Sequence, residues 1–409
     1  MSDACRGLPR DVHRGLARDV RRGLIATGAL AAVAAVGVFI AFSGQSTRGG
    51  RAAAVGNRRF AHAAASCSPA ATPEPAGSSP LLLGISASIR LERGSDRCEE
   101  AVLAAQTGVH AVREDLSWAL TEPHENQYDW SNYDAVVRTA TETGLMVLPI
   151  LDDAPSWAAP GEGCLPANAA SYASFTAAAV ERYGPGGEFW RENPALPERP
   201  LVWYELWNEP WDADCNRDPA TYARMVVAAA GAGRSVNPSV RFLIGADTSF
   251  HTLTGQREDW IARMYAAVPD LGHYFDAVSV HPYGGDPDVY TPGGDTDNEP
   301  ARLEQVHAEL AARGDGDKPL WVTEIGWSTC SGTSGCVTEA TQAQYLDEFL
   351  HDAVTTWRSY VRAVFVYDLR DNAPSPADDR EAWFGLLRPD LSHKPAWAVL
   401  HDFVDQLGG

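Results

Sequence analysis

From residue 81 onward, short apolar runs rich in β-branched and aromatic residues alternate with longer Ala-rich stretches of helical periodicity. Polar loops containing Gly, Pro, Asn or Asp separate them. The apolar runs predict eight strands, at 81–87, 109–115, 146–152, 201–207, 240–246, 277–283, 319–325 and 361–367. The longer stretches predict eight helices, at about 96–107, 131–143, 169–183, 219–236, 258–268, 300–313, 338–357 and 395–406.

Eight successive strand–helix pairs favour an α/β fold in which residues 81–409 form a closed (β/α)8 TIM barrel. Near-continuous apolar runs such as 146–152 fit strands that are buried on both faces. A doubly wound open sheet is the alternative, but neither GxGxxG nor GxxxxGKS/T follows any of the eight runs. We therefore expect a barrel whose active site lies at the carboxyl ends of its strands.

A different pattern precedes the barrel. Residues 24–42 form a run of 19 residues without a charge, and six arginines lie ahead of it in 1–23. The run is long enough for a single transmembrane helix, and its basic flank favours a cytoplasmic N-terminus. A cleaved secretory signal or, because Arg21 and Arg22 are adjacent, a twin-arginine export signal is an alternative. All three interpretations place the barrel domain outside the cytoplasm, either at the cell membrane or secreted.

The segment 43–80 consists mainly of Ala, Ser, Gly, Pro and Arg, with almost no large apolar side chain. It cannot bury enough apolar surface to offset the entropy lost on ordering, so we expect a disordered linker. The predicted organisation is a basic cytoplasmic segment at 1–23, a transmembrane or signal segment at 24–42, a linker at 43–80 and a barrel domain at 81–409.

Charge changes at the same boundary. The chain has 33 Lys+Arg and 54 Asp+Glu, a net charge of −21, yet residues 1–80 hold ten arginines and only four acidic residues. The strongly acidic barrel domain should repel phosphate backbones, so nucleic acid is not expected as a partner. With 45% hydrophobic residues the chain has ample material for a large core. Neutral ligands are compatible with this charge balance.

Seven cysteines are present, and one of them, Cys5, lies ahead of the apolar run. The other six suit disulfide bonds in an oxidising compartment. A short loop and the expected adjacency of barrel loops give the predicted pairs Cys330–Cys336, Cys164–Cys215 and Cys67–Cys98. A zinc site is the alternative, but no CxxC or HxxxH spacing supports it.

Polar side chains gather at the predicted carboxyl ends of the strands. They are Arg113, Asp115, Asp152, Asp153, Asn208, Glu209, Asp247, His281, Tyr283, Glu324, Tyr367 and Asp368. Glu209 and Glu324 come from strands four and seven, so both can project into one mouth from opposite sides. Two opposed carboxyl groups flanked by aromatic residues suit cleavage of a glycosidic bond, because one protonates the leaving oxygen and the other attacks or supports the sugar cation.

Three motifs occur in order at the ends of strands four, six and seven. They are WNEP (207–210), SVHPY (279–283) and WVTEIGW (321–327). Together they resemble the catalytic barrel of clan A retaining glycoside hydrolases, of the family 39 or family 5 type that includes cellulases and β-xylosidases. The resemblance covers about 81–409, and the tail WFGLL (383–387) followed by Lys394-Pro395-Ala396 is similar to the last turn of such enzymes.

The resemblance implies roles for the matching residues. Glu209 would be the general acid/base and Glu324 the nucleophile, while Asn208 would hydrogen-bond the sugar 2-hydroxyl. Arg113 would lie beside Glu324 and keep it ionised, because a neighbouring cation lowers a carboxyl pKa.

Further roles concern the rim of the mouth. The resemblance implies that Tyr283 hydrogen-bonds the nucleophile and that His281 orients the acid/base or contacts substrate. Related enzymes carry a tryptophan at the end of strand eight, where this chain has Tyr367. Other substrate-binding candidates are Asp152, Trp157 and Trp327, although strand-end acids can simply be solvated and aromatic rings can simply fill the core. Glu205 is expected to be structural.

The sequence thus predicts an exported or membrane-anchored glycosidase that cleaves a β-linked oligo- or polysaccharide by double displacement, without a metal or an organic cofactor. The expected partners are the carbohydrate and, through 24–42 if uncleaved, a membrane; the protein is expected to be a monomer. A cell-surface transglycosidase and a non-catalytic carbohydrate-binding protein are the alternatives. The polar loop 284–300 is expected to form part of the rim.

Overall fold

The computed structural model describes residue 67 and residues 81–408, with gaps at 93–94, 162, 214, 216, 248–249, 252–256, 285–301, 332–334 and 373. The predicted segments 1–23 and 24–42, the linker apart from Cys67, and nearly all of the loop 284–300 therefore lie outside the described residues. Among the helices of the described part, none is both long and apolar enough to span a bilayer.

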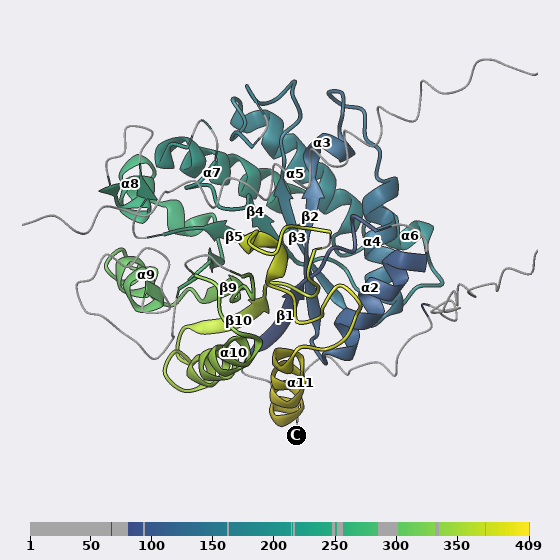
Figure 1. The fold of residues 1–409 in the computed structure, drawn as a ribbon. Coiled ribbons are helices and arrows are strands. Elements are labelled where there is room, and N and C mark those ends of the chain that lie inside the picture. The colour runs from purple at the N-terminus through teal and green to yellow at the C-terminus, as the bar shows by residue number, and fades with distance from the viewer. Residues whose placement is uncertain are drawn as a thin grey trace, which may run out of the picture. The chain divides into compact units, whose positions relative to one another are not determined.

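Eight parallel strands close into a barrel, as the alternating pattern predicts (Figure 1). The strands are β1 (Leu82–Ser86), β2 (Ala111–Ser117), β3 (Met146–Asp152), β4 (Trp203–Leu206), β5 (Arg241–Gly245), β8 (Ala277–Val280), β9 (Leu320–Ile325) and β10 (Val361–Val366). Their order around the barrel follows the chain, and β1 closes the sheet by pairing with both β2 and β10. The TIM-barrel prediction is confirmed.

Helices surround these strands in Figure 1. Those that match the eight predicted helices are α2 (Ser95–Gln106), α4 (Ser131–Glu142), α5 (Ala169–Tyr183), α7 (Pro219–Val236), α8 (Trp260–Ala267), α9 (Arg302–Ala311), α10 (Glu339–Val354) and α11 (Pro395–Gly408). The pattern did not predict α3 (Trp118–Thr121), α6 (Glu188–Glu192), the hairpin β6 (Phe250–His251) with β7 (Arg257–Glu258), or the 3-10 turns Leu271–His273 and Arg380–Trp383. Segments this short contain too few residues to show a period.

The interior of the barrel has an apolar floor and a polar layer above it. The floor is a buried cluster of Ala111, Leu148, Leu243, Ala277, Trp321, Ala363 and Phe365. Because side chains alternate along a strand, residues two positions further on also point inward. In four strands those residues are polar and almost fully buried, namely Arg113, Glu205, Ser279 and Thr323. The interior thus becomes polar toward the carboxyl ends of the strands.

Three disulfide bonds join the six cysteines in the predicted pairs. The Cα–Cα distances are 5.6 Å for Cys67–Cys98, 4.7 Å for Cys164–Cys215 and 5.1 Å for Cys330–Cys336. All three lie in the usual range for disulfides, so the prediction of disulfide pairing is confirmed. The second bond ties the loop after β3 to the loop after β4, and the third closes a loop after β9.

Candidate active site

Glu209 lies in a tight turn directly after β4. Trp207 and Glu209 have positive φ angles, of 77° and 42°, which residues other than glycine rarely adopt. The turn is held from outside the barrel, because the Tyr222 hydroxyl donates to the Leu206 carbonyl at 2.5 Å and the Trp207 ring packs against Tyr172. This backbone presents the Glu209 side chain to the mouth, with 27% of it exposed.

A glycine on the neighbouring strand makes room for the same turn. A Cβ atom at Gly245 would lie 2.6 Å from Cδ of Pro210 and 3.2 Å from the Trp211 ring. Glycine at this position therefore lets the segment after Glu209 pack against β5.

Glu324 lies near the carboxyl end of β9. The pairing of β9 with β10 shifts its register between Val364 and Val366, beside this residue. Gly326 follows, where a Cβ atom would lie only 1.9 Å from the backbone oxygen of Tyr367. Close approach of the two strand ends places Glu324 in the mouth, where its side chain is 13% exposed.

The two glutamates and a histidine form the centre of the site. One carboxylate oxygen each from Glu209 and Glu324 and one ring nitrogen of His281 lie within 4.8 Å of one another. His281 follows β8, and its Nδ1 is 2.8 Å from Oε1 of Glu209 and 3.6 Å from Oε2 of Glu324. The structure therefore brings both glutamates to one mouth.

Arg113, on β2, forms hydrogen bonds with residues of both β4 and β9 and with the turn after β4. Its Nη1 donates to Oε1 of Glu324 at 2.7 Å, and its Nε and Nη2 donate to the two oxygens of Glu205 at 2.7 and 3.0 Å. Nη2 also donates to Oδ1 of Asn208 at 2.8 Å. Burial alone would lower the pKa of Arg113, but the charges of Glu205 and Glu324 outweigh it and raise the pKa above its usual value. The guanidinium is thus a fixed cation beside Glu324.

Tyr283 holds the other oxygen of the same glutamate. Its hydroxyl donates to Oε2 of Glu324 at 2.8 Å, and its ring contacts Tyr367 and Phe384. Burial, reinforced by the negative charge of Glu324, raises the pKa of Tyr283 well above its usual value, so the phenol keeps its proton. Arg113 and Tyr283 thus fix both oxygens of Glu324.

His281 is almost completely buried and has polar partners on both ring nitrogens. Nδ1 contacts Glu209, and Nε2 lies 2.9 Å from Oγ1 of Thr323. Burial would lower the pKa of His281, but the charges of Glu324 and Glu209 and the hydrogen bond to Glu209 raise it overall. The imidazole therefore gains a proton more readily than a free histidine.

The sequence of the chain matches a known protein family. Residues 93–362 match the family described as cellulase, glycosyl hydrolase family 5, over more than half of the chain. The chain belongs to glycosyl hydrolase family 5. This family is of the clan A type that the motifs predict.

Solved structures resemble this family 5 glycosidase in fold. A family 39 glycoside hydrolase from Bacteroides cellulosilyticus WH2 is 23% identical, with a TM-score of 0.60 over 81% of this chain and 64% of that chain. A GH5_18 protein from Bifidobacterium longum subsp. infantis is 15% identical, with a TM-score of 0.56 over 80% and 79%. A monomeric β-xylosidase from Caulobacter crescentus CB15 is 18% identical, with a TM-score of 0.55 over 78% and 67%. No curated protein matches the sequence significantly.

The glycosidase thus spans about two thirds of the length of two of these three proteins. At these identities the likeness shows the fold, while the family rests on the sequence match over 93–362.

The other predicted site residues lie in three different settings. Tyr367 is half-buried after β10, where its ring contacts Tyr283 and Phe384. Asp152 is buried at the end of β3. Trp157 is partly exposed, and its Nε1 donates to the Glu122 carbonyl at 3.0 Å.

Trp327, a substrate-binding candidate in the sequence, is buried in the structure. Its side chain is only 4% exposed and packs against Tyr345 and Phe349 of α10. Trp327 therefore belongs to the hydrophobic core.

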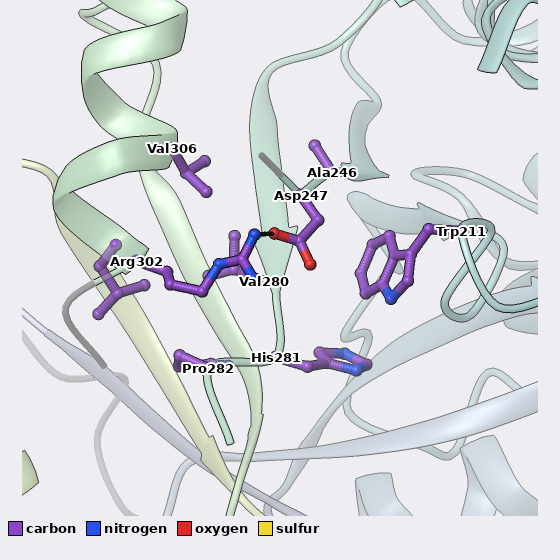
Figure 2. Close-up of a pocket in the computed structure, with 9 residues that line it drawn as sticks. Trp211, Ala246, Asp247, Val280, His281, Pro282, Arg302 and Val306 are labelled. Carbon is purple, nitrogen blue, oxygen red and sulfur yellow. Dashed lines mark hydrogen bonds and ion pairs between the residues drawn. The ribbon is translucent and has the colours of Figure 1, made fainter. Parts of the chain in front are cut away.

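One small pocket lies beside His281, on the side of the barrel between β5, β8 and α9 (Figure 2). Trp211 and the buried ion pair of Asp247 with Arg302 line it together with apolar side chains, and its free volume of about 10 Å³ holds about one water. Asp247 is one of the polar residues that the sequence places at the strand ends. Its partner could not be predicted, because Arg302 begins a helix 55 residues later.

Within the part of the chain that the structure describes, Glu209, His281 and Glu324 are also the group whose ligand atoms are close enough to share a metal ion. These atoms already form hydrogen bonds: His281 with Glu209, and Glu324 with Arg113 and Tyr283. A cation would have to displace these bonds beside the fixed charge of Arg113. The arrangement suits proton transfer and nucleophilic attack instead.

Proposed function

We propose that this family 5 glycosidase hydrolyses its substrate with retention of configuration, with Glu324 as the nucleophile and Glu209 as the general acid/base. The observation that carries this proposal is the proximity of the two acids, since one carboxylate oxygen of Glu209 lies within 4.8 Å of one carboxylate oxygen of Glu324. Double displacement requires carboxyl groups about 5–5.5 Å apart, whereas inversion requires about 6.5–9.5 Å to admit a water between acid and sugar. Two oxygens this close support the shorter separation.

In the first step an oxygen of Glu324 forms a bond to the anomeric carbon while the bond from that carbon to the leaving oxygen breaks. Glu209 gives its proton to the leaving oxygen. Arg113 and Tyr283 hold the attacking carboxylate in position, since each donates to a different oxygen of Glu324. In the second step Glu209 takes a proton from water, whose oxygen attacks the anomeric carbon and releases Glu324. The anomeric carbon is inverted twice, so its configuration is retained.

The proposed substrate is a β-linked oligo- or polysaccharide. Partly exposed rings at the mouth, those of Trp157, Trp211 and Tyr367, can pack on sugar faces. Asn208, beside Glu209, is proposed to bind the 2-hydroxyl, and Asp152 another hydroxyl. Similar folds include a β-xylosidase and an exo-β-1,4-mannosidase from Opitutaceae bacterium strain TAV5, both named for β-linked substrates. We also propose a monomer, as the name of the Caulobacter β-xylosidase states for that protein.

We further propose that the barrel works outside the cytoplasm, either anchored through 24–42 or secreted after cleavage, with 43–80 as a flexible linker. The uncharged run and its arginine flank support export. The three disulfide bonds support an oxidising compartment. Fractionation of cells followed by N-terminal sequencing of the barrel species separates an anchored from a cleaved chain, and a purely cytoplasmic protein with free thiols would contradict export.

The central test combines a substrate panel with single substitutions. Aryl β-glycosides and polysaccharides are incubated with the wild type, Glu324→Ala, Glu209→Ala and, as the matched control, Glu198→Ala, which removes an exposed carboxylate. We expect loss of activity in Glu324→Ala, rescue of Glu209→Ala on activated substrates by azide, and no change in the control. Proton NMR of the first product should show the β-anomer; an α-anomer, or full activity of Glu324→Ala, would refute the proposal. An added acceptor oligosaccharide separates hydrolysis from transglycosylation.

A further inference from the structure

Glu205 has no exposed surface, yet it lies at the centre of the polar layer inside the barrel. The sequence suggested a structural role for it. The structure shows that it accepts two hydrogen bonds from Arg113 and a third from Oγ of Ser279 at 2.6 Å. One carboxylate thus contacts groups from β2 and β8, and each of these groups leads toward one of the two proposed catalytic acids.

The first connection runs to the nucleophile. Arg113 donates from Nε and Nη2, along one edge of its guanidinium, to Glu205, and from Nη1 to Glu324. The fork geometry of arginine makes the two contacts interdependent, because Glu205 fixes the plane in which Nη1 points.

The second connection runs to the acid/base through two hydroxyl groups. Ser279 Oγ lies 2.5 Å from Oγ1 of Thr323, which lies 2.9 Å from Nε2 of His281. A hydroxyl carries one proton. Because Ser279 donates its proton to Glu205, it can only accept from Thr323. Thr323 has then used its own proton and can only accept from His281, so Nε2 must carry a hydrogen.

We infer that Glu205, acting through Ser279 and Thr323, fixes the proton of neutral His281 on Nε2 and is thereby a positioning residue for the acid/base Glu209. The only ring nitrogen left to gain a proton is Nδ1, which faces Oε1 of Glu209. As an acceptor it holds the catalytic proton of Glu209 between Oε1 and the ring, whereas an N–H at Nδ1 would occupy Oε1 and move that proton to the other oxygen of Glu209. The role rests on the proposed function of Glu209, whereas the tautomer does not.

The surroundings of His281 are consistent with a second proton on this ring. The charged and titratable groups that face it from the neighbouring elements are Glu209 after β4, Glu324 on β9, Arg113 on β2, Tyr283 after β8, and the Asp247–Arg302 pair beyond the pocket. The two carboxylates nearest to the ring outweigh the one nearby cation, and the net effect raises the pKa of His281.

The first test reads the tautomer directly. The full chain is labelled with 15N-histidine, and the signal of His281 is assigned by its loss in His281→Gln. We expect Nε2–H in the wild type and in Thr323→Ser, which keeps a hydroxyl. In Ser279→Ala the Thr323 hydroxyl is released to donate to Nε2, and in Thr323→Val Nε2–H has no acceptor, so both should show Nδ1–H. An unchanged tautomer in these two variants overturns the inference, whatever the activity.

The second test asks whether the effect reaches catalysis. General acid catalysis contributes about 10²–10⁴-fold, so a misdirected proton should lower kcat/KM about tenfold for glycosides with poor leaving groups. Activated dinitrophenyl glycosides, which do not need the proton, should change less than about twofold. Thr143→Val removes a buried hydroxyl at the end of α4, far from this chain of bonds, and is the control. Equal losses on both substrate types in Thr323→Val would mean a merely structural role and overturn the inference.

Discussion

Replacing Arg113 by methionine should destabilise the barrel more than any exposed substitution. The guanidinium makes four hydrogen bonds, three of them to carboxylates, and lies in the interior. Hydrogen bonds to charged groups contribute about 1.5–3 kcal/mol each, but removing the buried cation also removes its own desolvation cost. The net loss expected for breaking one side of a buried ion pair is about 3–5 kcal/mol.

Urea unfolding followed by tryptophan fluorescence measures this loss. Arg241→Met is the matched control, because its side chain is 52% exposed and it makes a surface pair with Asp276; it should cost less than about 1 kcal/mol. The buried carboxylate that Arg113→Met leaves behind accounts for most of the cost. The double variant Arg113→Met/Glu205→Gln should therefore be more stable than the sum of the two single changes predicts, by about 2 kcal/mol. A cost for Arg113→Met within 1 kcal/mol of the control, or strict additivity, would refute this reasoning.

Three further predictions concern other features of the structure. Gly245→Ala places a Cβ 2.6 Å from Pro210 and should lower kcat/KM at least about tenfold by moving Glu209. The control Gly231→Ala, which has open space around it, should leave kcat/KM unchanged, and equal kinetics of the two variants would contradict the close approach at Gly245. Folding raises the pKa of His281, so protonation of His281 stabilises the fold fully below about pH 6.5, and this stabilisation should disappear as the pH rises through the raised pKa. The difference in unfolding free energy between wild type and His281→Gln should therefore shrink from pH 6 to 9. A difference that grows over this range would contradict the prediction. Replacing the Cys164–Cys215 pair by serines should lower the free energy of unfolding by about 4 kcal/mol, and replacing the Cys330–Cys336 pair should lower it by about 2 kcal/mol, because the first bond closes the longer loop. Urea unfolding that shows the reverse order would argue against loop entropy as the origin of the stabilisation.

The elements of the barrel were predictable because buried parallel strands and amphipathic helices leave strong periodic patterns. The predicted β3 at 146–152 and α7 at 219–236 coincide with the observed bounds. The prediction for β2 was shifted, with 109–115 expected and Ala111–Ser117 observed, because the polar residues Arg113 to Asp115 resemble the end of a strand when they in fact lie in its middle.

The sequence predicts those site residues whose position depends on strand order, but not those whose position depends on side-chain packing. Glu209 and Glu324 follow from their places at the ends of two strands. Trp327 stands only three residues after Glu324, and the sequence alone does not say on which side of β9 the chain turns. The partners of Glu205 were not predictable for a related reason, since alternation from Trp203 places it inside the barrel, but the residues that it contacts lie on strands distant in sequence.

The apolar floor beneath the polar layer has a consequence for how strongly its charges act. The ring of Phe365 lies so closely over its partner residue on the neighbouring strand, Gly84, that Gly84 has no room for a Cβ, and the rings of Trp203 and Trp321 pack against each other. These rings seal one end of the tube against bulk water, so the field of Arg113 is weakly shielded from below. A smaller side chain at Phe365 would admit solvent there and weaken the electrostatic interactions of the polar layer above it, without changing any residue at the mouth.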